Sequence, residues 1–101
     1  MGFGNLAKMA QQMQAGMARV DAELQELRIE GSAGGGAVKA VATGKQELES
    51  ITIDPGVVDP EDVEMLQDLV LAAVRDALDQ AKAVAEQKVG QVTGGLRIPG
   101  L

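Results

Sequence analysis

The chain has no histidine, cysteine, tryptophan or tyrosine, and its single aromatic residue is Phe3. Without imidazole and thiol groups it lacks the usual general base, the thiolate nucleophile and the preferred zinc ligands. It also cannot form a disulfide, which suits a reducing compartment. Carboxylates are abundant, but none falls in a recognisable catalytic motif. We therefore expect no enzymatic activity, no metal, no cofactor and no small-molecule substrate.

Long apolar runs are also missing. The longest, Leu69 to Val74, is far too short to cross a bilayer. The first residues do not combine a basic start with an apolar run, as a secretory signal would. We expect a soluble, cytoplasmic protein that does not associate with membranes.

Large side chains are scarce in what would have to be the core. The 101 residues are the length of one small domain, and 46% of them are hydrophobic, but these are mostly Ala, Val, Leu, Ile and five Met. Small side chains each bury little area, so a domain built from them gains little stability from its own core. A partner subunit would supply the missing contacts, and we expect a homo-oligomer.

Charge is unevenly distributed along the chain. The net charge of −6 argues against indiscriminate binding to polyanions. Residues 54–68, however, carry six acids and no base, whereas residues 1–20 carry two bases and no acid. Residues 80–101 carry one acid and three bases, Lys82, Lys88 and Arg97. Both ends of the chain are therefore mildly cationic.

The first segment has the strongest periodicity. Apolar residues three and four apart predict a helix: Phe3, Leu6, Ala10, Met13, Met17, Val20, Leu24 and Leu27. Asn5 lies near its start and Gly31 just past its end. A helix of about 24 residues is roughly 36 Å long, so one end should project from so small a domain. The Met-rich stripe is more typical of a packed core than of a cofactor site.

The middle of the chain predicts three strands, over residues 28–33, 37–43 and 46–54. Gly34 to Gly36 favours a hairpin turn over a phosphate cradle, because the spacing of the known phosphate loops is absent. The apolar residues of the third strand do not alternate cleanly, which predicts a bulge near Glu49 and Ser50.

A second long helix is predicted from Pro60 to about Val89. Asp59 is a preferred N-cap, and the acids after Pro60 favour the positive end of the helix dipole, so capping explains them better than a calcium loop does. The helix has two apolar faces. One would cover the sheet, and the other needs the first helix, a second subunit, or both. We assign residues 1–92 to a single domain and residues 93–101 to a flexible tail containing Gly and Pro.

Five stretches in this order resemble the YbaB/EbfC family of nucleoid-associated proteins: GNLAKMAQQMQ (4–14), VKAVATG (38–44), ITIDP (51–55), EMLQDLVLAAVRDAL (64–78) and GGLRIPG (94–100). The resemblance implies an α+β homodimer in which the strands of two subunits form one antiparallel sheet and the long helices project as paired arms. It also implies a protein of the nucleoid that binds DNA without a strict consensus and alters its conformation.

The residues themselves suggest where DNA would bind. Lys8, Gln12 and Arg19 share one side of the first helix. If the two helices pack antiparallel, Lys8 lies near Lys82, Lys88 and Arg97, with Gln11 and Gln12 as polar auxiliaries. Aromatic side chains for stacking are lacking, so duplex DNA is favoured over single strands. Contacts should be mainly to phosphates, and about five of them would give a slope of log K against log salt near −4.5.

An alternative from a different class remains open at this stage. Long helices with a Met-rich surface could bind protein partners, as an acidic interaction or chaperone-like module does. The acidic middle of the chain suits that hypothesis slightly better than DNA binding.

Overall fold

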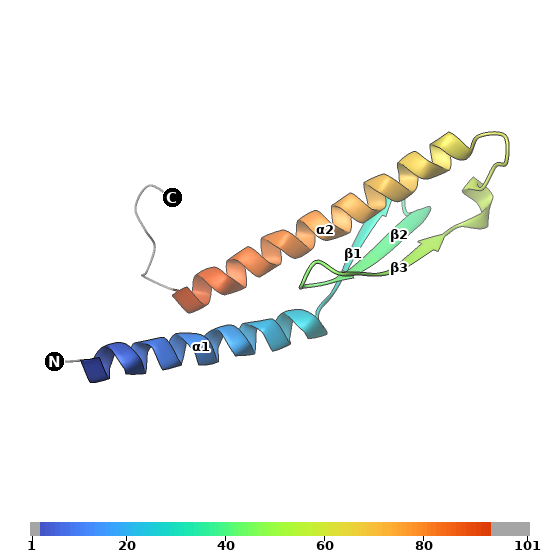
Figure 1. Cartoon of the computed structure of the whole chain (residues 1–101). Helices are drawn as coiled ribbons and strands as arrows, with labels where there is room; N and C mark the ends of the chain where they lie inside the picture. Colours follow the sequence, from blue (N-terminus) through green and yellow to red (C-terminus); the bar gives the residue numbers. More distant parts are fainter. Residues whose placement is uncertain (1–2, 94–101) are drawn as a thin grey trace, which may run out of the picture.

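The computed structural model describes residues 3–93 and has two long helices and a three-stranded antiparallel sheet, which confirms the predicted α+β class. The elements in order are α1 (Phe3–Glu26), β1 (Arg28–Ala33), β2 (Val38–Thr43), β3 (Leu48–Ile53), a single 3₁₀ turn η1 (Pro55–Val57) and α2 (Val63–Thr93). The molecule is elongated, with extents of 71 × 29 × 16 Å, because α1 and the C-terminal half of α2 both extend away from the sheet (Figure 1).

The sheet has the order β1-β2-β3 and follows the predicted turns. Gly34, Gly35 and Gly36 all have positive φ, which explains why glycines form the β1–β2 turn. Between β2 and β3, Val41 pairs with Ser50 and Ala42 pairs with Leu48, so Glu49 is the extra residue of a bulge. Both features confirm the sequence-based prediction.

The core lies between one face of the sheet and α2 (Figure 1). Its fully buried residues are mostly alanines: Val38, Ala40, Ala42, Ala73 and Ala77. Small residues are needed because the backbones approach closely. A Cβ on Gly31 would lie 2.3 Å from the Ala77 nitrogen and 2.5 Å from the Ala73 oxygen. This side of α2 therefore packs almost directly on β1 and β2.

The start of α2 differs from the prediction. The helix begins at Val63 rather than Pro60, and its cap is Asp62, whose Oδ1 accepts a hydrogen bond from the Met65 nitrogen at 3.2 Å. Asp59 instead begins a tight turn, in which its backbone carbonyl oxygen accepts a hydrogen bond from the Asp62 backbone nitrogen at 2.9 Å. The sequence offered two aspartates three residues apart, and either one can cap a helix. The helix also continues past Val89, through Thr93.

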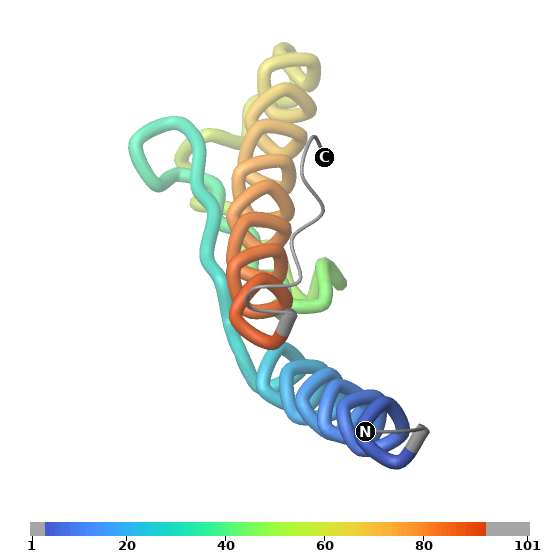
Figure 2. The backbone as a smooth tube through the Cα atoms, turned by 90° about the vertical axis from the view of Figure 1, so that its left-hand side faces the viewer, coloured from blue at the N-terminus to red at the C-terminus, as the bar shows by residue number. Residues whose placement is uncertain are grey.

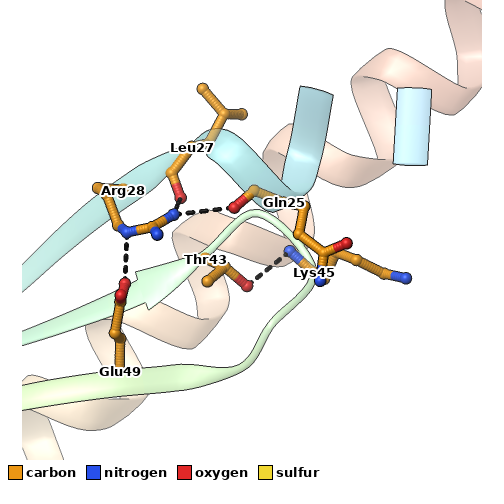
Figure 3. A network of polar contacts seen from close by, with 6 residues as sticks. All are labelled: Gln25, Leu27, Arg28, Thr43, Lys45 and Glu49. Carbon is orange, nitrogen blue, oxygen red and sulfur yellow. Dashed lines mark hydrogen bonds and ion pairs between the residues drawn. The ribbon is translucent and has the colours of Figure 1, made fainter. Parts of the chain in front are cut away.

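The base of α1 is tied to the sheet by polar contacts (Figure 3). The Arg28 guanidinium donates to the carbonyl oxygens of Gln25 and Leu27 at 2.8 and 3.0 Å, and it also forms an ion pair with Glu49 across the sheet. These carbonyls belong to the last turn of α1 and the residue after it, where carbonyl oxygens have no N–H donor within the helix.

The turn between β2 and β3 holds the same helix from another side. The Gly44 nitrogen donates to the Leu24 oxygen at 2.8 Å. Lys45 Nζ lies 2.5 Å from Asp21 Oδ1, and this hydrogen bond and the charge of Asp21 raise the pKa of Lys45 above its ordinary 10.5. We call this pair and the Leu24–Gly44 hydrogen bond the α1 clamp.

Beyond the clamp, α1 leaves the body as an arm (Figure 2). Among the stripe residues from Leu6 onward, Val20 and Leu24 alone are buried, whereas Leu6 is 64% and Met17 is 38% exposed. The expectation that this stripe forms a core is therefore wrong within the protomer for most of its length. Most of the stripe finds no surface there because α1 meets α2 around Gly16 and Val20, as described next.

Candidate nucleic-acid interface

The two helices meet where the end of α2 passes the middle of α1. Gly16 is the contact point: a Cβ built there would lie 2.9 Å from Cγ1 of Val92. Beside this contact the helices enclose an open cleft of about 450 Å³. Its lining is mostly polar on both sides: Gln12, Arg19 and Glu23 from α1, and Lys88 and Gln91 from α2.

The α1 wall of the cleft follows from helical spacing. Gln12, Arg19 and Glu23 are seven and four residues apart, which places them on one side of the helix. Lys8 continues this row toward the N-terminus and is exposed. The row borders Gly16 and Val20, which face α2, so its charges stand at the rim of the helix crossing.

The cleft holds one carboxylate and two cations. Lys88 Nζ lies 3.3 Å from Glu23 Oε2, and the Lys88 side chain is only 29% exposed. Arg19, by contrast, forms no ion pair with any carboxylate of residues 3–93. The Gln12 and Gln91 amides add donors that carry no charge. Such a set suits a singly charged oxyanion such as a phosphodiester.

The remaining cations fall into two groups. Arg28, Lys39 and Lys45 are paired with Glu49, Glu30 and Asp21 in and around the sheet, and we regard them as structural. Among residues 3–93, the cations without such a pair are Lys8, Arg19, Arg75 and Lys82. Three of these four, Lys8, Arg19 and Lys82, are among the residues predicted from the sequence to bind DNA.

The predicted meeting of Lys8 with Lys82 and Lys88 is not formed. Lys88 faces Glu23, which is fifteen residues from Lys8, or roughly 22 Å along α1. Lys82 lies on another side of α2, where it borders a separate cleft with Gln46 and Glu86. The helices are antiparallel as supposed, but α2 meets α1 at its middle rather than at its tip.

Other predicted and missed residues can be placed as well. Gln11 is exposed on α1 but lies outside the lining of the cleft, and Arg97 lies outside the described residues. Sequence reasoning missed Gln91 and Glu23. Gln91 follows Lys88 by three residues and Glu23 follows Arg19 by four, so helical spacing from the predicted cations would have found both.

Residues 3–93 contain no group of three or more acidic, His or Cys side chains placed to hold a metal ion. In that range, neither helix is apolar enough over a sufficient length to cross a bilayer.

A model of the YbaB/EbfC DNA-binding family matches residues 1–96 of this sequence. The chain belongs to the YbaB/EbfC DNA-binding family. This confirms the resemblance seen in the sequence motifs.

Individual relatives agree with the family model. A nucleoid-associated protein from Acetivibrio thermocellus is 56% identical over 105 residues, which cover 99% of this chain and 93% of the relative. Another from Moorella thermoacetica is 54% identical over 103 residues, covering 99% of both chains. The crystal structure of an uncharacterized protein from Helicobacter pylori superposes with a TM-score of 0.83 at 21% identity, over 93% of this chain and 99% of that one. At that identity the superposition establishes the shared fold.

Proposed function

We propose that the protein is a nucleoid-associated protein that binds duplex DNA as a homodimer, mainly through phosphates and with little sequence specificity, and alters the conformation of the DNA. The observation that carries this proposal is the cleft between α1 and α2, where Arg19, Lys88 and two glutamine amides converge in a chain of a DNA-binding family. We assign no catalytic step to the chain, which has neither histidine nor cysteine.

Phosphate contacts are supported by the chemistry of the groups. Arg19 and Lys8, which form no ion pair with a carboxylate of residues 3–93, attract phosphate regardless of base sequence. Lys8 and Arg19 lie on one row of α1, eleven residues apart, or roughly 16 Å. That row could follow a DNA backbone, and two copies would present two such rows to one duplex and could bend it.

The homodimer is supported by apolar surface left open in the protomer. Leu66, Val70, Leu71 and Val74 line a groove of about 550 Å³ on α2 that is almost wholly apolar, with Gln67 at its edge. β3 is an edge strand with Leu48 and Ile51 more than 40% exposed. An exposed edge strand and an open apolar groove both suit contact with a second copy, which would extend the sheet as the family resemblance implies.

Fluorescence anisotropy with a labelled duplex tests the cleft. Arg19→Gln should weaken binding about tenfold, because a phosphate contact is lost in each cleft. For the same reason, the slope of log K against log salt should become shallower by about one unit for each cleft. Lys39→Gln is the matched control, since it removes the same charge from the sheet and should change affinity less than twofold. Equal effects of the two variants would contradict the assignment of the cleft.

Sedimentation equilibrium tests the dimer separately. A species of twice the protomer mass is expected at micromolar concentration. A monomer under those conditions would remove the homodimer from the proposal, and the anisotropy experiment would still decide whether DNA binds.

A further inference from the structure

Glu23 places a negative charge inside the cleft that is proposed for a negative ligand. Its Oε2 lies 3.3 Å from Lys88 Nζ, and it stands one helical turn from Arg19 on the same side of α1. A phosphate that approaches Arg19 therefore meets Glu23 and finds Lys88 already paired. The other ion pairs between residues 3 and 93 lie in or around the sheet, outside this cleft.

We propose that Glu23 is a built-in competitor of the DNA phosphate for Lys88, and that it holds the affinity of the cleft below what its cations would otherwise provide. This inference rests on the proposed function. It assigns the side chain a role in tuning affinity, in addition to its ion pair between the helices. The pair is partly exposed, with side-chain exposures of 29% and 48%, so it contributes little to stability and can open at small cost.

The salt dependence of binding follows from the same geometry. When a lysine without a carboxylate partner binds DNA, cations leave the phosphate and nothing replaces them. When Lys88 binds DNA, Glu23 loses its partner and takes up a cation from solution. This uptake offsets part of the release, so the slope of log K against log salt for the wild-type protein should be shallower by less than about 0.9 unit for each cleft.

The experiment measures duplex binding at several salt concentrations for the wild-type chain and for Glu23→Gln, Lys88→Gln and the double variant. Glu23→Gln should tighten binding about three- to tenfold, since Lys88 then has no carboxylate partner and is free for the phosphate, and should steepen the slope of log K against log salt by less than about 0.9 unit for each cleft. In the Lys88→Gln background, the same substitution should change affinity less than twofold, because the residue for which Glu23 competes is gone.

Glu61→Gln is the matched control. It removes one carboxylate from the turn before α2, at the opposite end of the molecule (Figure 1), and so makes the same change in net charge. Its effect should stay below twofold. Circular dichroism checks the helices of each variant, and Glu23→Ala provides a second substitution that favours the helix and should give the same gain in affinity.

Two results would overturn the inference alone: a response to Glu23→Gln no larger than that to Glu61→Gln, or a gain that persists in full without Lys88. Both leave wild-type DNA binding intact. If neither the wild-type protein nor the Glu23→Gln variant binds duplex, the proposed function fails, and the inference fails with it.

Discussion

The body of the protein and its α1 arm are built in opposite ways. In the body, α2 lies so close to β1 and β2 that the buried positions hold glycine, alanine and one valine. In α1, the buried hydrophobic side chains are Val20 and Leu24, which lie one helical turn apart. Most of the other described side chains of the arm, both apolar and charged, are exposed. Close backbone packing therefore stabilises the fold, and the region free of such packing presents the residues that we propose for binding.

The sharpest test of this contrast compares two glycines. Gly31→Ala in the body should lower the free energy of unfolding by about 3 kcal/mol, because the new Cβ would overlap the backbone of Ala73 and Ala77, which cannot rotate away. Gly16→Ala in the arm meets only the Val92 side chain and gains about 1 kcal/mol of helix propensity, so a change within about 1 kcal/mol is expected. Urea denaturation followed by circular dichroism measures both. Equal losses would show that the arm is packed as tightly as the body.

Truncating an apolar side chain should also lower stability more in the body than in the arm, although the difference is smaller. Val38 is fully buried, and Val38→Ala should lower stability by about 2 kcal/mol at every protein concentration. Leu6→Ala removes a side chain that is 64% exposed, so it should change the stability of the protomer by no more than about 0.5 kcal/mol. A large loss that appears only at high concentration would instead identify Leu6 as part of the homodimer contact.

The smallest effect concerns the α1 clamp, where the two regions join. The pKa of Lys45 is raised in the folded state by Asp21, so this pair stabilises the fold fully below the ordinary lysine value of 10.5 and progressively less as pH rises through the higher folded value. Asp21→Asn should therefore lower the melting temperature slightly near neutral pH, and the difference from wild type should vanish at strongly alkaline pH. Thermal melts across that range test the sign, and a difference that grows with pH would contradict it.

Most of the body could be predicted from the sequence. The hairpin at Gly34 to Gly36 and the bulge at Glu49 follow from rules that act within a few residues. The start of α2 could not be predicted in the same way, because Asp59 and Asp62 satisfy the same local rule. Only the path of the chain leaving η1 selects Asp62 as the cap.

The candidate site was predictable in part. Helical spacing on α1 correctly grouped Gln12 with Arg19, and Lys88 was named from the charge of the second helix. Which of these would meet across the two helices could not be derived, because helical spacing determines a side of a helix but not its register against another helix. The position of Glu23 opposite Lys88 depends on where Gly16 allows Val92 to approach.

Local chemistry alone thus specified the order of the elements, the turns, the bulge and the side of α1 that carries charge, because each depends on residues that are neighbours along the chain. The crossing point of α1 and α2, the pairing of Glu23 with Lys88 and the exposure of the apolar stripe on α1 were decided only by the folded arrangement. They depend on the close approach of α2 to the sheet and on the α1 clamp, which sets the direction of α1. These contacts join residues far apart in the sequence.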